Sequence, residues 1–128
     1  MRYNKYGNRK VKTSEGTFAS INEYRRWQEL KLLQRAGEIK DLQKQVPFEL
    51  IPAQYEMFER YGKKGQRLKD GKRCIEQSVV YVADFVYIDN RTGERVVEDA
   101  KSPATKTDAY IIKRKLMKFR HNITVNEV

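Results

Sequence analysis

The sequence predicts a single α/β domain in which a mixed sheet is flanked by helices. Three observations lead to this prediction. A chain of 128 residues can build one modest hydrophobic core but not two. Two segments have the apolar spacing of amphipathic helices, and the remaining apolar runs have the length and composition of strands. Their order is helix, strand, strand, strand, helix, strand, and one helix on each face of the sheet would bury them all.

The first helix is expected from about Ser20 to Ala36, where apolar residues recur at helical spacing. Gly37 is a favourable residue just past its C-terminal end. Ser20 and Glu23 have the spacing of a capping box, in which each side chain binds a backbone N–H of the other. A helix cap therefore explains Glu23 without any catalytic role.

Strands are expected next. The segment 46–51 is bounded by Pro47 near its start and Pro52 after its end. The segment 78–88 is apolar on both faces except at Asp84, which is typical of a central strand.

The turn at 90–93 favours a hairpin, with 95–100 as the returning strand. After Pro103, residues 107–119 have the pattern of a second amphipathic helix, and 123–128 that of a last strand.

The net charge of +10 indicates a polyanionic partner, and nucleic acid is the first candidate. Basic residues concentrate in an N-terminal arm (1–17) and in a flap at about 58–74. A membrane partner is not expected, because no long apolar run, signal peptide or lipidation motif is present. The chain has one cysteine, Cys74, and one histidine, His121, so it cannot form an internal disulfide or a Cys/His zinc site. Any metal must therefore be held by carboxylates. The absence of an internal disulfide fits a reducing compartment, so a cytoplasmic protein is expected.

Charged residues end the strand VVEDAKS (96–102). Side chains alternate across a strand, so Asp99 and Lys101 should lie on one face, about 7 Å apart, and Glu98 on the other. A hairpin would bring Asp84 beside Asp99. Two converging carboxylates repel each other, and Mg²⁺ would relieve that repulsion by binding both. A metal-bound water could then attack a phosphodiester, with Lys101 beside it.

At these positions the chain resembles the PD-(D/E)xK nucleases, whose signature is an acid on one strand and an acid-x-Lys on the next. Ala83-Asp84 stands where the family has Pro-Asp, and Asp99-Ala100-Lys101 matches the acid-x-Lys. The element order is similar to the αβββαβ restriction-endonuclease-like core. Ser20-x-x-Glu23, Gly37-Glu38-Ile39 and Gln45 resemble small phage-encoded members grouped with Holliday junction resolvases and TnsA-like endonucleases.

The resemblance implies an endodeoxyribonuclease that uses Mg²⁺ or Mn²⁺ and no small-molecule cofactor. Asp84, Asp99, Glu23 and the backbone carbonyl of Ala100 would hold the metal, and Lys101 would assist the attacking water. The implied substrate is DNA, branched as in Holliday junctions of phage replication or recombination. Symmetric cleavage of two strands implies a homodimer, and a phage origin implies the cytoplasm of a bacterial host. Candidate phosphate contacts are Lys5, Arg9, Lys10, Lys63, Lys64, Arg67, Lys106, Lys113 and Lys115.

Other interpretations remain open from sequence. Asp99 and Lys101 alone could form a salt bridge at the end of a strand. Glu98 is expected to face away and pair with a basic surface, but a register slip of one residue would exchange it with Asp99. The whole chain could also be a non-catalytic nucleic-acid-binding protein, or an adaptor of a replication or packaging complex.

Overall fold

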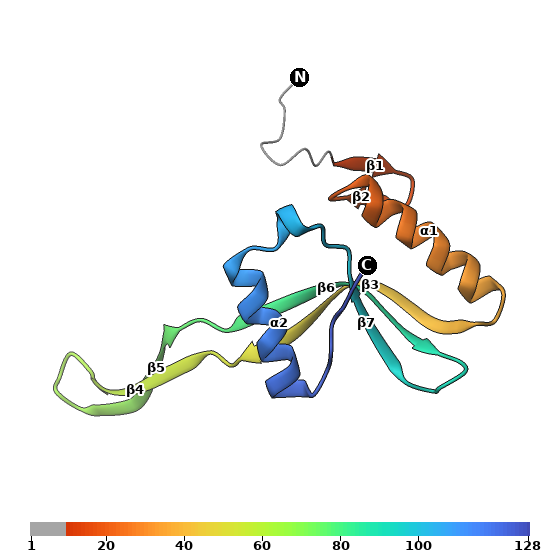
Figure 1. Ribbon diagram of the computed structural model, residues 1–128. Coiled ribbons are helices and arrows are strands. Elements are labelled where there is room, and N and C mark those ends of the chain that lie inside the picture. The colour runs from red at the N-terminus through yellow and green to blue at the C-terminus, as the bar shows by residue number, and fades with distance from the viewer. Residues whose placement is uncertain (1–9) are drawn as a thin grey trace, which may run out of the picture.

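The computed structural model of the chain describes residues 10–128, and its centre is a four-stranded mixed sheet (Figure 1). The sheet has the order β3 (Ile39–Ile51), β6 (Val79–Asp89), β7 (Arg95–Asp99) and β8 (Asn126–Glu127). The strands β3, β6 and β7 are antiparallel to their neighbours, whereas β8 is parallel to β7. The predicted class, a mixed α/β fold with a mixed sheet and two helices, is confirmed.

The helix α1 (Ile21–Arg35) agrees with the prediction within one residue at each end. Ser20 Oγ accepts a hydrogen bond from the Glu23 backbone N–H at 3.2 Å, which caps the first turn. Gly37 has a φ of 80°, a left-handed conformation that glycine adopts without steric cost, and the chain turns there into β3.

The helix α2 (Asp108–His121) begins after Thr107, whose side chain accepts from the Tyr110 N–H at 3.1 Å. It ends at Asn122, also left-handed, and the chain returns along β7 as β8. The last strand was predicted over 123–128, but only two of its residues pair with β7. Between β7 and α2 lies a 3₁₀ turn, η1 (Pro103–Thr105).

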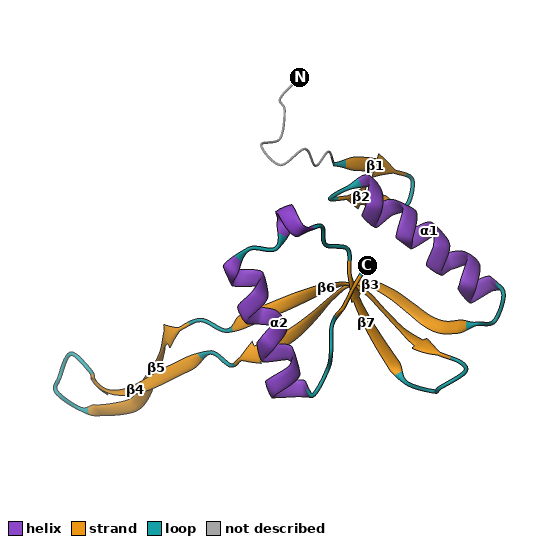
Figure 2. Ribbon diagram, in the orientation of Figure 1, coloured by secondary structure: helices purple, strands orange, loops and turns teal. Residues whose placement is uncertain are grey.

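Two hydrophobic clusters show that the helices cover opposite faces of the sheet. Val97 belongs to the cluster that includes Met117 of α2, whereas its neighbour Val96 packs on the cluster that includes Leu30 of α1. Adjacent residues of a strand point to opposite faces. The sheet is therefore the middle layer of three, as Figure 2 shows.

The strand expected over 46–51 is longer than predicted, because residues 39–45 form the first half of β3. Its polar sequence hides the strand, because pairing with β6 rather than apolar alternation fixes its conformation. The predicted flap is a hairpin of two longer strands, β4 (Gln54–Tyr61) and β5 (Arg67–Glu76).

The structure also differs from the prediction at the N-terminus. Residues 11–17, expected within the basic arm (1–17), form together with Phe18 a small hairpin of β1 (Val11–Thr13) and β2 (Gly16–Phe18). Residues 1–9 lie outside the described part of the chain. No helix between residues 10 and 128 is both long and apolar enough to cross a membrane.

Candidate active site

Asp84 and Asp99 lie next to each other on neighbouring strands. The β6–β7 pairing places Phe85 opposite Glu98, and one further step in this register places Asp84 opposite Asp99. Asp84 Oδ2 accepts from the Ala100 backbone N–H at 2.9 Å. Asp99 is 2 % exposed, and its Oδ2 accepts from the Tyr81 hydroxyl at 2.5 Å. The end of β7 thus holds two carboxylates side by side.

Glu23 brings a third carboxylate to this place from the first turn of α1. It is 5 % exposed. Its Oε2 accepts from the Ala19 N–H at 3.2 Å, one residue before the position that a capping box would use. Its Oε1 accepts from Gln45 Nε2 at 3.1 Å. Glu23 therefore helps to cap the helix and also faces the strand acids.

Gln45 joins the helix acid to the strand acid. Its Nε2 also donates to Asp84 Oδ1 at 3.3 Å. The pairs on either side of it in the register place Gln45 directly opposite Asp84. Its φ of 54° is unusual for a residue with a side chain inside a strand, and such a conformation costs about 1–3 kcal/mol. Strain of this kind concentrates at functional sites.

Lys101 completes the group from the loop after β7. Its Nζ lies 3.3 Å from Asp99 Oδ1, an ion pair without the alignment of a hydrogen bond. The ammonium also lies over the Tyr110 ring, 4.8 Å from its centre. The structure therefore brings together four predicted catalytic residues: Glu23, Asp84, Asp99 and Lys101.

The carboxylates destabilise each other's charged forms. Burial, then repulsion from Asp99 and Glu23, raises the pKa of Asp84 to about 7, against the hydrogen bond from Ala100. Burial and repulsion from Asp99 likewise raise the pKa of Glu23. The positive charges of Lys101 and Lys44 lower the pKa of Glu23 but do not cancel these effects, so the site would be stabilised by an added positive charge.

The donor atoms fit a hard divalent cation. All are oxygens, and Asp99 Oδ1 is buried without a hydrogen bond within the described residues. In residues 10–128, however, no three His, Cys, Asp or Glu side chains stand close enough together to hold one ion. The Gln45 amide binds one oxygen of Glu23 and one of Asp84, so it would have to turn away for both oxygens to bind a metal.

A cavity of about 270 Å³ opens beside these acids. It gives solvent access to Glu23 and Asp84, and Lys10, a predicted phosphate contact, lies on its wall. Its lining is Lys10, Thr17, Phe18, Ala19, Glu23, Gln45 and Asp84.

The family of this chain follows from a match over nearly its whole length. The model of the family described as "Protein of unknown function (DUF1064)" matches residues 3–126. The chain belongs to the DUF1064 family. No curated protein and no solved structure matches it. Family membership therefore leaves the activity to be argued from the geometry of the acids.

Glu98 is oriented away from Asp99, as alternation predicts, but its partner differs from the expected basic surface. It is 2 % exposed, and Arg26 of α1 donates to its two oxygens at 2.8 and 2.7 Å. The Tyr87 hydroxyl donates to it as well. Sequence reasoning missed Arg26, although the residue lies three positions after Glu23, on a neighbouring part of the same helix face.

The predicted phosphate contacts of this DUF1064 chain fall on separate surfaces. Lys63 and Lys64 lie in the turn between β4 and β5, and Arg67 begins β5. Lys106 is 3.2 Å from Glu127 Oε2, so an acid already offsets its charge. Lys113 is half-buried and Lys115 exposed on α2. Lys5 and Arg9 lie outside the described residues.

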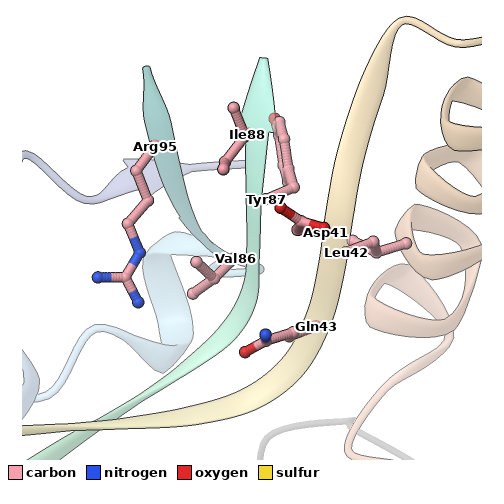
Figure 3. Close-up of a pocket in the computed structure, with 7 residues that line it drawn as sticks. All are labelled: Asp41, Leu42, Gln43, Val86, Tyr87, Ile88 and Arg95. Carbon is pink, nitrogen blue, oxygen red and sulfur yellow. The ribbon is translucent and has the colours of Figure 1, made fainter. Parts of the chain in front are cut away.

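A separate cavity of about 320 Å³ lies at the bulge of β3, on the side of the sheet that Figure 3 shows. Its lining includes two charged residues, Asp41, which is left-handed with a φ of 55°, and Arg95 of β7. The apolar residues Val86 and Ile88 also line it. None of the four residues of the acidic site lines it.

Proposed function

We propose that this chain is a metal-dependent endonuclease of the PD-(D/E)xK type, acting on DNA phosphodiester bonds. The observation that carries the proposal is the placement of Asp84 beside Asp99, with Glu23 and Lys101 next to them, in a chain of net charge +10. Burying a carboxylate costs free energy unless the carboxylate is paired or binds a metal. A bound cation would offset this cost for the buried acids of the site.

The topology supports a restriction-endonuclease-like core. The elements α1, β3, β6, β7, α2 and β8 follow the αβββαβ order, with the β4–β5 hairpin inserted between the first two strands. The antiparallel β3, β6 and β7 and the parallel β8 are compatible with that core.

Asp84, Asp99 and Glu23 would hold Mg²⁺ or Mn²⁺, with the Ala100 carbonyl as a further ligand. When bound, the cation supplies Lewis acidity and a more acidic water. The Tyr81 hydroxyl holds the orientation of Asp99. The Lys101 ammonium stands where it can orient the attacking water and offset charge on the phosphate in the transition state.

The basic surfaces would bind the phosphate backbone with little sequence readout. Branched DNA as substrate, a homodimer and a cytoplasmic location belong to the same proposal, through the resemblance to junction resolvases.

Cleavage assays on supercoiled plasmid and on a four-way junction test this function. Each substrate is incubated with EDTA, Mg²⁺ or Mn²⁺, using the wild type, Lys101→Ala and the control Lys40→Ala. Lys40 is an exposed residue of β3 away from the acids. We expect cleavage only with metal, its loss in Lys101→Ala and normal rates in Lys40→Ala. Metal-dependent cleavage by Lys101→Ala at the wild-type rate, or no cleavage with either metal, would contradict the proposal. A protein that binds DNA but never cuts it would be the non-catalytic binder or adaptor.

A further inference from the structure

The hairpin β4–β5 extends away from the three layers of the fold, as Figure 1 shows. Its strands pair with each other in a separate two-stranded sheet. Large apolar side chains are exposed on it, among them Met57 at 61 % and Tyr61 at 58 %. A two-stranded ribbon without a core is only marginally stable in water. Contacts between its own strands must therefore hold it together.

Those contacts are pairs of a cation and an aromatic ring across the two strands. Lys72 lies over Tyr55 at 4.2 Å, Arg73 over Phe58 at 5.2 Å, and Arg67 over Tyr61 at 5.7 Å. The Phe58 ring also lies on Gly71, where an added Cβ would be 2.2 Å from the ring. The ribbon is thus held together by cations of β5 that lie over aromatic rings of β4.

Three acids of the ribbon, Glu56, Glu59 and Asp70, already have partners. Arg73 pairs with Glu56, and Arg67 pairs with Asp70 at 2.5 Å. Glu59 accepts from the Tyr61 hydroxyl at 2.6 Å. Within the described residues, no acid forms an ion pair with four exposed cations of the outer half and the turn, which are Arg60, Lys63, Lys64 and Lys69.

We propose that this ribbon lies in a groove of a DNA duplex, about one helical turn from the phosphate at the acidic site. The major groove, about 12 Å wide, admits a two-stranded β-ribbon. The unpaired cations would contact phosphates along the groove. The identity of the partner as DNA rests on the proposed function, whereas the placement of the duplex rests on the ribbon.

The length of the strands sets the required length of the duplex. β4 begins at Gln54, nine residues after Gln45, so an extended chain places it up to about 30 Å from the acids. Arg60 is up to about 50 Å away by the same reckoning. One turn of B-DNA is about 34–36 Å long. A duplex arm should therefore need roughly 10–15 base pairs beyond the cleaved phosphate to reach the ribbon.

A second copy of this chain is a weaker candidate for the same surface. Two ribbons laid together would bring like charges into contact, which is unfavourable for pairing. A polyanion satisfies the unpaired cations and also shields the exposed aromatic rings.

The test measures DNA binding in EDTA, where cleavage is not involved. Fluorescence anisotropy is recorded for four-way junctions with arms of 6, 10, 15 and 20 base pairs at several salt concentrations. The ribbon variant is R60A/K63A/K64A/K69A. The matched control R25A/R35A/K40A/R91A also removes four exposed positive charges, but at α1, at the start of β3 and at the β6–β7 turn.

We expect wild-type affinity to rise about tenfold or more as the arms lengthen from 6 to 15 base pairs and then to level off. The ribbon variant should lose this rise, and its slope of log affinity against log salt should fall by about 3 to 4. The control should keep the length dependence. An equal loss in both variants, or arm-length dependence that survives in the ribbon variant, would overturn the inference.

Light scattering separates DNA binding from self-association. If the ribbon variant changes from dimer to monomer while its salt slope is unchanged, the ribbon binds a second copy and the inference fails. Ribbon-dependent binding without cleavage under any metal would refute the nuclease proposal but support the inference. If the ribbon variant binds DNA like the wild type and the protein cleaves DNA, the inference about the ribbon fails and the nuclease proposal is supported.

Discussion

Gln45 and Asp84 face each other across β3 and β6, joined by a 3.3 Å hydrogen bond, and Gln45 adopts a left-handed backbone to stand there. The same amide binds Glu23 on α1. One strained residue therefore connects the helix acid with the strand acid, and its strain and its hydrogen bonds can be separated by substitution.

Gln45→Gly should be more stable than Gln45→Ala by about 1 kcal/mol, because only glycine adopts a left-handed backbone without a steric penalty. Both variants lose the amide, so their difference reports the backbone alone. Urea denaturation measures it. Gln43, two residues earlier on β3 and not left-handed, is the control: there alanine should be the more stable substitution. Equal stability of the two Gln45 variants would contradict the strain.

The stability of the protein should fall as pH rises from about 4 to 7. The pKa of Asp84 is about 7 in the folded state, against about 3.8 as its ordinary value. The folded state therefore binds more protons over this range, and deprotonation favours unfolding. The raised pKa of Glu23 acts in the same direction.

Asp84→Asn should remove much of that fall, which could reach about 4 kcal/mol for a single group. Urea denaturation at pH 4.5, 6 and 8 measures the difference. The variant should exceed the wild type in stability at pH 8, and the gap should narrow at pH 4.5. A gap that is constant with pH would show that Asp84 does not titrate in this range.

Mg²⁺ or Mn²⁺ should raise the melting temperature of the wild type at pH 8, because a ligand that binds only the folded state stabilises it. Asp84→Asn and Asp99→Asn should lose this response. Ca²⁺ is also an oxygen-seeking cation and should act in the same direction. Differential scanning fluorimetry at fixed ionic strength gives the readout. If both variants kept the wild-type rise in melting temperature, the ion would bind at another site.

Arg26→Ala should destabilise the fold by about 3 kcal/mol or more, because it leaves the buried Glu98 carboxylate without its cation. Adding Glu98→Gln should recover part of the loss, since the buried charge is then gone. Arg25→Ala, at the exposed neighbouring position, should stay within about 0.5 kcal/mol of the wild type. If Arg26→Ala abolished metal binding without unfolding, the pair would belong to the active site instead.

Sequence reasoning succeeded where local patterns and burial agree. The alternation in VVEDAKS placed Asp99 and Glu98 on different faces, and apolar residues on both sides of Asp84 identified β6 as central. Each conclusion follows from the two-residue period of a strand, which is a local property and needs no knowledge of residues distant in the sequence.

It failed where a distant partner decides the conformation. The polar first half of β3 is a strand because β6 pairs with it, and nothing within 39–45 indicates that pairing. Gln45, whose backbone is left-handed, likewise has its partners Glu23 and Asp84 far away in the sequence. Arg26 looked like one of many surface cations, because its partner Glu98 is 72 residues away.

Glu23 was left with two interpretations, a helix cap or a metal ligand, and one pair of variants separates them. Glu23→Gln keeps an oxygen that can accept from the Ala19 N–H, so the first turn of α1 stays capped. It removes the negative charge that a cation would bind. Glu23→Ala removes both, and should cost about 1 kcal/mol in stability from the lost cap.

If Glu23 binds metal, Glu23→Gln should be at least as stable as the wild type in EDTA, because the buried charge is gone, but should show a weaker thermal shift with Mg²⁺ and slower cleavage of the junction. If Glu23 is only a cap, Glu23→Gln should match the wild type in its thermal shift with Mg²⁺ and in its rate of cleavage, and only Glu23→Ala should lose stability. We expect the first outcome, because a carboxylate that is 5 % exposed and beside Asp84 is more costly than a cap requires. Ser20→Ala removes the other half of the cap and should leave the metal response unchanged.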